Sequence, residues 1–200
     1  PLGPGGLVLP DKFAKVADRV RADQRVTFRD IDLGHFDREL AICWDIYSAA
    51  WEQNWGYAPM SRDEFEHMAS ELRMLVVPQF AFVAHVNGDP AAFMLVVPDY
   101  NSVLRRIGNG RLFPTGAIRL LLAKNRLRSG RVMALGVKQQ YRSTGLSALL
   151  MHEVIRRANA YGATEAEASW ILEDNALMNR PLVAMGAKEY RRWRIYEKAT

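Results

Sequence analysis

The chain has 200 residues, of which 49% are hydrophobic and 24% are charged, with a net charge of +5. This composition is typical of a single globular domain with one sizeable core. It contains no apolar run near the ~18 residues that a membrane-spanning helix needs, so no transmembrane segment is expected. The charge is uneven, because residues 101–152 hold ten Lys and Arg side chains and no Asp or Glu.

A single cysteine, Cys43, excludes an internal disulfide and favours a reducing compartment. Its apolar neighbours Ile42 and Trp44 favour a buried structural thiol over a nucleophile. Residues 1–6 are neither basic nor continuously apolar, unlike a secretory signal. We therefore expect a cytoplasmic protein.

The first third of the chain is predicted to be mainly helical. Apolar residues recur at helical spacing over residues 11–22, after a lead rich in Gly and Pro. We interpret residues 1–24 as this lead with a linker helix, and residues 25–200 as the domain. Three elements follow: a strand at 26–29, a helix at about 36–51, and a second helix that begins with a capping box from Ser61 to Glu64.

A hairpin and an insertion are expected in the middle of the chain. Residues 80–86 and 92–97 are predicted strands, and the pair Asn87-Gly88 supplies the turn between them. The pattern then lapses across a basic insertion that contains a short apolar helix at 118–127. This insertion could form a lid over an acceptor site or rest on a membrane surface; we favour the lid.

Strands alternate with helices over the rest of the chain. The predicted elements are a strand at 132–137, a helix at 145–161, a strand at 165–170, a helix at 175–185 and a final strand at 188–196. This order predicts a mixed sheet that helices cover on both faces. Pro181 is expected to kink or break the last helix.

Residues 137–150 carry the most informative local pattern, a strand end followed by a basic loop and a helix start. Backbone N–H groups at the positive end of a helix dipole lack intrahelical partners and suit a phosphate. Arg142 adds a fixed charge, and Gly145 permits a turn or a close ligand approach. The basic middle of the chain suits a strongly anionic ligand, although it could also be a solvated surface.

The spacing Arg142-x-x-Gly145-x-Ser147 resembles the Arg/Gln-x-x-Gly-x-Gly/Ala loop of the GNAT (Gcn5-related) N-acetyltransferases, which wraps the pyrophosphate of acetyl-coenzyme A. Asn175 and Gly186 resemble the residues that open and close the last helix of that family beside the cofactor. The resemblance implies an α/β (α+β) GNAT fold, with a central mixed, mostly antiparallel, twisted sheet flanked by helices. The helical insertion would then lie between the third and fourth strands.

Three segments resemble, in their amino-acid sequence, a narrower group of proteins. Residues 47–60, 110–114 and 169–175 resemble the C-terminal half of uncharacterised bacterial proteins about twice this length, whose N-terminal half is a diverged GNAT-like lobe. This likeness implies a second GNAT-like lobe, or a homodimer, as a possible partner.

The family resemblance implies direct transfer of an acetyl group from acetyl-coenzyme A, as co-substrate, to the amine of a small-molecule or peptide acceptor. Neither a covalent intermediate nor a metal is required, and we see no Cys/His zinc spacing and predict no metal site. A backbone donor at the developing oxyanion would stabilise the transition state. The cofactor-binding residues that the resemblance implies are Leu135, Gly136, Val137, Arg142, Ser143, Thr144, Gly145, Leu146, Ser147 and Asn175.

The sequence departs from the family where protons are handled. Many GNAT enzymes carry a Tyr seven residues after the Asn, where this chain has Leu182, and some carry a strand carboxylate where it has Trp170. Ser143 and Ser147 also replace common small residues of the loop. These departures put catalysis in doubt more than cofactor binding.

Glu173, Asp174, Tyr190 and Tyr196 are the remaining candidate proton acceptors. Asp174 is also a natural helix-start residue, the two tyrosines could cover the sheet, and Glu173 could be a solvated carboxylate. We choose Glu173 as the catalytic general base.

The sequence indicates less clearly which residues would bind the amine acceptor. Tyr47, Trp51 and Trp55 recur four residues apart, with Asp45 and Glu52 nearby. They could form an aromatic, acidic wall for a cationic amine, although packing against the sheet is the commoner role of such a stripe.

Three functions remain open. The first is an acetyl-coenzyme A-dependent N-acetyltransferase, and the second is a catalytically weakened GNAT-fold module that binds acyl-coenzyme A or supports a partner. The third is a basic surface for nucleic acid or anionic lipid. No aromatic-interleaved platform accompanies the arginines, so nucleic acid is not an expected partner.

Overall fold

The computed structural model describes residues 8–52, 57–107, 115–123, 128–168 and 170–196. It divides the chain into two compact units, Pro1–Ser169 and Trp170–Thr200, which are described separately below. The division lies after the last strand of the sheet. The predicted linker helix therefore belongs to the same unit as the sheet.

The first unit is built on a five-stranded sheet in the order β1-β2-β3-β4-β5. Its strands are β1 (Val26–Asp30), β2 (Ala81–Val86), β3 (Asp89–Pro98), β4 (Ser129–Val137) and β5 (Glu165–Ala168). Neighbouring strands are antiparallel except β4 and β5, which run parallel. This topology confirms the predicted mixed, mostly antiparallel sheet.

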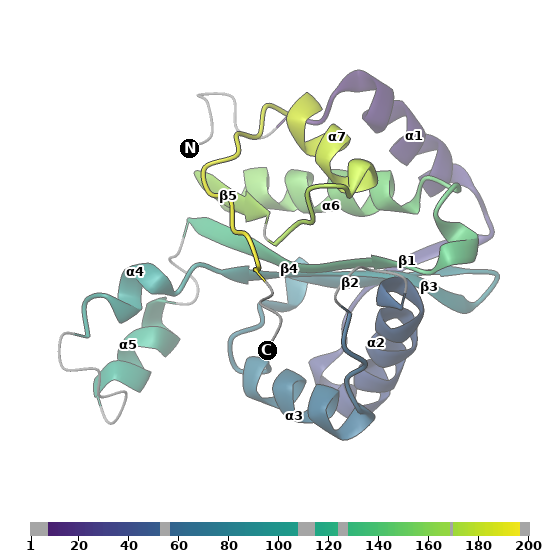
Figure 1. Ribbon diagram of the computed structural model, residues 1–200. Helices are drawn as coiled ribbons and strands as arrows, with labels where there is room; N and C mark the ends of the chain where they lie inside the picture. Colours follow the sequence, from purple (N-terminus) through teal and green to yellow (C-terminus); the bar gives the residue numbers. More distant parts are fainter. Residues whose placement is uncertain (1–7, 53–56, 108–114, 124–127, 169, 197–200) are drawn as a thin grey trace. The chain divides into compact units, whose positions relative to one another are not determined.

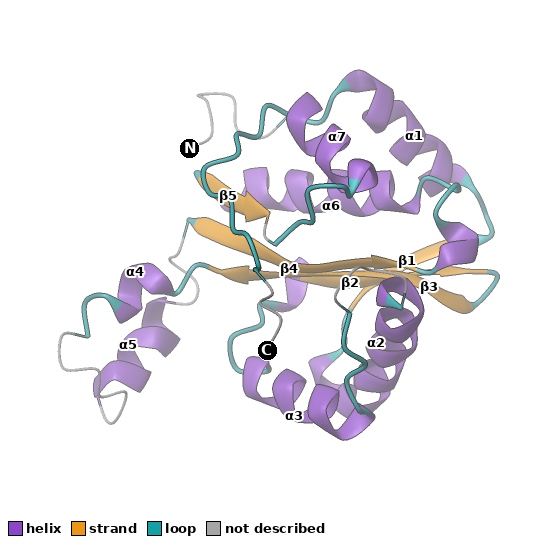
Figure 2. Ribbon diagram, viewed as in Figure 1, coloured by secondary structure: helices purple, strands orange, loops and turns teal. Residues whose placement is uncertain are grey.

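Helices cover both faces of this sheet, as predicted (Figures 1 and 2). One face carries α1 (Asp11–Ala22) and α6 (Leu146–Tyr161), and the other carries α2 (Phe36–Trp51) and α3 (Arg62–Leu72). Single helical turns connect some elements: η1 (Leu33–His35), η2 (Pro78–Phe80) and η3 (Gln139–Tyr141). The insertion between β3 and β4 forms α4 (Asn101–Leu104) and α5 (Thr115–Ala123). The end of the predicted 118–127 helix lies outside the described residues.

Alternation along the strands produces two cores, because successive side chains point to opposite faces. Phe82 and Met94 pack with Leu149 beneath α6, whereas Val83 and Phe93 pack beneath α2. Two hydrophobic layers therefore fix the register of the central strands.

Local sequence signals behave as expected at two sites. Ser61 and Glu64 form the complete capping box at the start of α3. Asn87 and Gly88 both have positive φ, of 52° and 86°, as the hairpin turn between β2 and β3 requires. These positions need no long-range contact to adopt their conformation.

A bulge interrupts the pairing of β4 with β3. Leu95 pairs with Ala134 and Val96 with Val132, so Met133 is an extra residue on β4. The bulge lies where β4 also leaves β5.

The second unit contains α7 (Ala176–Ala184), which Asn175 caps and which ends before Gly186 at a φ of 83°. The prediction for Pro181 was a kink or a break. The helix runs through Pro181, so a break is wrong: the side-chain cap and the bonds around the last turn hold the helix despite one missing N–H. The kink stays a prediction. The predicted strand at 188–196 is also wrong. Within the described part of this unit those residues pair with no strand, and Trp193, Ile195 and Tyr196 are exposed.

Within the described part of the chain, every helix is too short or too polar to traverse a lipid bilayer.

Candidate functional site

An opening forms along the edge of β4 because β5 is the shorter strand. The two strands pair from Ser129 with Glu165 to Val132 with Ala168. Across residues 134–137, β4 keeps its pairing with β3 but has no strand partner on the other side among the described residues of this unit. Backbone hydrogen-bonding groups at such an edge are available to a ligand.

The register decides which backbone groups face this opening. The Lys138 N–H donates to the Ala91 carbonyl of β3, at 2.9 Å. Backbone groups alternate along a strand, so Gly136 also faces β3, while Leu135 and Val137 direct theirs to the open edge. Two of the three predicted β4 residues therefore present backbone groups to the opening.

Gly136 has a packing role that the sequence did not indicate. A β-carbon at this position would lie 2.6 Å from Trp51 Cζ3 and 2.9 Å from Phe93 Cε1. The missing side chain lets the Trp51 ring lie directly against the β4 backbone. This close approach explains why glycine occupies the position.

The loop after β4 ends in a group of unsatisfied backbone donors. Gly145 adopts a left-handed conformation, with a φ of 88°, and precedes the first residue of α6. Among the described residues, the N–H groups of Ser143, Gly145, Leu146 and Ser147 have no hydrogen-bond acceptor, whereas that of Thr144 donates to Tyr141. Free N–H groups at a helix N-terminus form a favourable environment for an anion.

The basic side chains of this loop are tied to α2. Arg142 Nη2 donates to the Ala50 carbonyl at 2.8 Å, in the last turn of α2, where a positive charge suits the helix dipole. The Lys138 ammonium pairs with the Asp45 carboxylate of the same helix. Arg142 was predicted to add charge at the phosphate site; its guanidinium donates to a helix end, and its role at a phosphate stays a prediction. The pairing spans 92 residues, and no local signal could have revealed it.

Helix α1 supports the loop from the other face of the sheet. A β-carbon at Gly145 would lie 2.6 Å from Val16 Cγ1 and 3.0 Å from Val20 Cγ2. Gly145 is thus required both by its positive φ and by the close approach of α1. The amphipathic pattern predicted this helix but not its contact with the loop.

A buried carboxylate holds α1 and α6 together. Glu153 is 2% exposed and accepts hydrogen bonds from three guanidinium groups, those of Arg21, Arg156 and Arg157. Burial alone would raise the pKa of Glu153, but the hydrogen bonds outweigh it and hold the pKa at about 2. The carboxylate is therefore charged at neutral pH.

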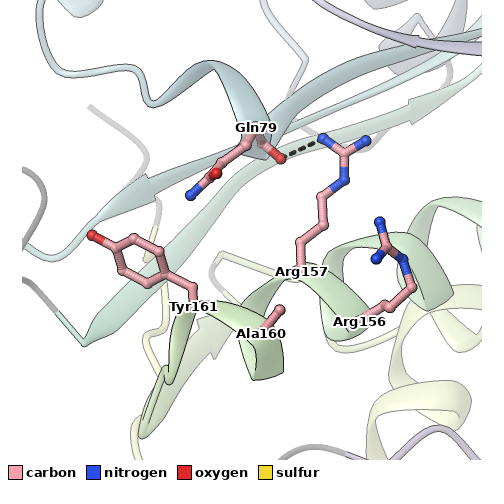
Figure 3. Close-up of a pocket in the computed structure, with 5 residues that line it drawn as sticks. All are labelled: Gln79, Arg156, Arg157, Ala160 and Tyr161. Atoms are coloured by element: carbon pink, nitrogen blue, oxygen red, sulfur yellow. Dashed lines mark hydrogen bonds between the residues drawn. The ribbon is translucent and has the colours of Figure 1, made fainter.

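A hollow of about 190 Å³ lies near the C-terminal end of α6 (Figure 3). Its lining residues are Gln79, Arg156, Arg157, Ala160 and Tyr161. Arg157 donates to the Gln79 carbonyl at 2.7 Å, and both arginines bind Glu153. The guanidinium groups that line the hollow are therefore already paired within the protein. The hollow lies at the end of α6 opposite to the proposed phosphate loop.

The aromatic stripe of α2 packs internally. The Tyr47 ring stacks on Trp51, with centroids 4.7 Å apart, and lies 5.4 Å from Phe65. Burial raises the pKa of the Tyr47 hydroxyl, and the neighbouring Tyr57 adds a smaller upward shift. These contacts support the packing interpretation of the stripe; Trp55 lies outside the described residues.

Cys43 on the same helix is buried, as predicted. Burial, together with the charge of Glu39, raises the pKa of its thiol to about 12. A thiol that stays protonated at neutral pH is a structural residue rather than a nucleophile.

The predicted proton-handling residues lie in the second unit. Glu173 Oε1 accepts from Arg192 Nη1 at 2.9 Å, and its side chain is 72% exposed. The Asn175 side chain accepts from the Met178 N–H at 3.2 Å and caps α7. Trp170 and Tyr196 are strongly exposed within this unit. The capping role of Asn175 follows the prediction that it opens the last helix.

Sequence and structure comparisons identify the family. A model of the "Acetyltransferase (GNAT) family" matches residues 40–180. "Protein YghO" of Escherichia coli (strain K12) is 36% identical over 198 residues, which cover 96% of this chain and 50% of that protein. "Bacterial ceramide synthase" of Caulobacter vibrioides is 27% identical over 180 residues, which cover 87% and 47%. The chain thus spans about half the length of the curated relatives it matches.

A solved structure of the aminoglycoside N-acetyltransferase AAC(6')-Iy in complex with CoA shares the fold. The match has a TM-score of 0.54 and 15% identity, and covers 88% of this chain and 95% of that one. The sheet, the helices on its faces and the family match agree with the expected GNAT fold. The chain belongs to the acetyltransferase (GNAT) family.

Proposed function

We propose that this chain transfers an acyl group, acetyl in the simplest case, from acyl-coenzyme A to an amine. The observation that carries the proposal is the open edge of β4, which leads directly to the unsatisfied N–H groups at the start of α6. A flexible thioester arm could follow the edge while its pyrophosphate binds the helix end. The CoA bound to AAC(6')-Iy, on the same fold, supports acetyl-coenzyme A as co-substrate.

The proposal assigns cofactor binding mainly to backbone groups. Leu135 and Val137 would bind the pantetheine amides and the thioester carbonyl, and Gly136 would keep Trp51 close to the strand. The loop residues Ser143, Thr144, Gly145, Leu146 and Ser147 would surround the pyrophosphate. Arg142 would act on it from the loop, while its guanidinium donates to the Ala50 carbonyl of α2.

The chemical step is direct attack by the amine nitrogen on the thioester carbon, which forms an amide and releases the coenzyme A thiolate. A backbone donor of β4 would stabilise the oxyanion. The attacking ammonium must first lose a proton, and Glu173 is the proposed base. It would have to exchange its contact with Arg192 for the amine or a bridging water. Asn175 would contact the cofactor through its Nδ2, because its Oδ1 caps α7.

A longer acyl chain and a lipid amine are the second candidate substrates. The observation that favours them is the match to a protein named bacterial ceramide synthase over 180 residues. A ceramide is the amide of a fatty acid and a long-chain amino alcohol, so its synthesis is also an N-acylation. A polyamine, amino acid, peptide or aminoglycoside remains the alternative acceptor.

A module that binds acyl-coenzyme A without turnover is the other candidate. Leu182 and Trp170 stand where many relatives carry proton-handling groups, and both lack such a group. A second GNAT-like lobe or a second copy of the chain could complete the site in either case. The span of the chain, about half that of its relatives, is consistent with this addition.

Calorimetric titration with acetyl-, octanoyl- and palmitoyl-coenzyme A tests the proposal, followed by amide formation with amines from each class. We expect binding to at least one thioester and acylation of one acceptor class. Tight binding without turnover, for the chain alone and for a full-length relative, would favour the binding module. Absence of binding to every thioester would refute both functions.

A further inference from the structure

The α4–α5 insertion leaves the sheet far from the proposed cofactor site. It joins the end of β3 to the start of β4, whereas the phosphate loop follows the other end of β4. Figure 1 shows both helices projecting beyond the sheet, apart from α2, α3 and α6. The insertion therefore lies away from the proposed phosphate site, and the predicted lid over an acceptor site stays a prediction.

Helix α5 presents an apolar stripe to solvent. Ile118, Leu121 and Leu122 are 56%, 61% and 66% exposed, and their spacing places them on one face of the helix. Leu104 of α4 is also exposed. Gly116, in contrast, is buried. A surface helix of a globular protein normally turns its polar side outward. On α5, large apolar side chains face the solvent instead.

Cations flank this stripe. Arg105 and Arg106 follow Leu104 on α4, and Arg119 follows Ile118 on α5; all three are exposed. No acidic residue occurs anywhere in residues 101–152. Exposed leucines with arginines beside them match the chemistry of an anionic bilayer surface, where apolar groups enter the acyl boundary and guanidinium groups bind phosphates. Nucleic acid would use the arginines but not the leucine stripe.

We propose that the α4–α5 hairpin docks this protein on the surface of an anionic phospholipid bilayer. Ile118, Leu121 and Leu122 would enter the headgroup boundary, and Arg105, Arg106 and Arg119 would contact lipid phosphates. The hairpin would bind reversibly, because a short amphipathic element with a few large apolar side chains gives modest affinity. This inference does not depend on the proposed acyl transfer, since docking requires no reaction.

Vesicle flotation at physiological salt tests the inference. The probes are liposomes of phosphatidylcholine alone and of phosphatidylcholine with phosphatidylglycerol. The wild-type chain should float with the anionic liposomes. Ile118→Ser with Leu122→Ser should lower the partition coefficient at least about tenfold, because two exposed apolar side chains are lost. Arg105→Glu with Arg106→Glu should also lower it.

The matched control is Met74→Ser, which alters a 70% exposed apolar side chain outside the insertion and should bind like wild type. Circular dichroism should show that every variant is folded, as expected for substitutions at exposed positions. Equal flotation of wild type and the Ile118→Ser/Leu122→Ser variant would overturn the inference, as would no wild-type binding to anionic liposomes. A dimer in light scattering that the same variant converts to a monomer would assign the stripe to a second copy and also overturn it.

Discussion

The strand and loop at residues 133–147 differ sharply from the segment at 170–196, although the family resemblance assigns site residues to both. The first is held from three sides, by pairing with β3, by Trp51 of α2 and by Val16 of α1. In the second, the candidate proton acceptors are exposed, and Glu173 is held by one exposed ion pair. The proposed cofactor site is therefore built into the packing of the fold, while the proposed catalytic residues are a few exposed side chains that single substitutions can remove.

This contrast explains why binding is the more robust half of the proposal. Backbone N–H groups remain in place when Ser143 and Ser147 replace smaller residues, because the loop conformation is set by Gly145 and its neighbours. A proton-transfer group disappears with one substitution, as at Leu182. The predictions below test each side of this contrast, from the largest expected effect to the smallest.

Helix α1, which backs the first region, is tied to α6 by the buried carboxylate of Glu153, and the loss of this carboxylate should have the largest effect. Glu153→Gln should lower the free energy of unfolding by about 3 kcal/mol, because three guanidinium groups lose their shared partner. Chemical denaturation measures this change. Glu189→Gln, which alters an exposed pair with Arg192, is the control and should leave the midpoint nearly unchanged. Equal effects of the two substitutions would remove the distinction between the regions.

The ion pairs of Glu153 also predict how stability depends on pH. The folded-state pKa of Glu153, about 2, lies below its ordinary value of 4.5. The stabilisation from its charged form is therefore fully present above about pH 4.5 and is lost as the pH falls towards about 2. The difference in stability between wild type and Glu153→Gln should shrink over that interval. A difference that stays constant down to pH 2 would contradict this account.

Glu173→Gln tests the second region. If Glu173 is the general base, the substitution should lower the acyl-transfer rate about 10²-fold or more while acyl-coenzyme A affinity stays nearly intact. Glu189→Gln is again the matched control, because it removes the other carboxylate bound to Arg192. Full activity of Glu173→Gln with an identified acceptor would eliminate the proposed role.

Gly145→Asp tests the phosphate loop. A negative charge at the pyrophosphate should weaken acyl-coenzyme A binding at least about tenfold, or ~1.4 kcal/mol. The control is Gly162→Asp, which places the same residue at another glycine of positive φ, at the far end of α6. Calorimetry on both folded proteins measures the difference. An unchanged acyl-coenzyme A affinity in Gly145→Asp would show that the pyrophosphate does not bind at this loop.

The ion pair between Lys138 and Asp45 should have the smallest effect. Asp45→Asn releases the ammonium and removes a negative charge beside the loop, which should raise acyl-coenzyme A affinity by up to about threefold. Glu52→Gln removes an equal charge from the end of the same helix without touching Lys138. Identical gains from both substitutions would attribute the effect to net charge rather than to this pair.

The sequence predicted the features that local chemistry determines. The capping box at Ser61, the Asn87-Gly88 turn and the ends of α7 all depend on residues within a few positions of each other. The order of strands and helices followed from periodicity and from the family resemblance. The strand end, loop and helix start at residues 137–150 were predicted for the same reason, while phosphate binding there stays a prediction.

Features that depend on distant partners were not predictable. The alternating residues at 188–196 fit a strand, but alternation does not supply the neighbouring strand that a ladder needs. The Arg142 contact with Ala50 and the packing of Trp51 over Gly136 join segments whose approach only the folded chain defines. The binding role of Leu135 and Val137 and the catalytic role of Glu173 stay predictions.

The contact of α1 with Gly145 also bears on where the minimal folding unit begins. The family match starts at residue 40 and the first strand at Val26, so a shortened chain starting at either point would retain strands β2 to β5. It would nevertheless lose Val16 and Val20 from behind the loop and Arg21 from Glu153. Water would then reach the rear of a segment that needs a rigid backing to keep its donors aligned. A domain boundary drawn from sequence similarity alone would therefore remove the helix that supports the proposed anion-binding loop.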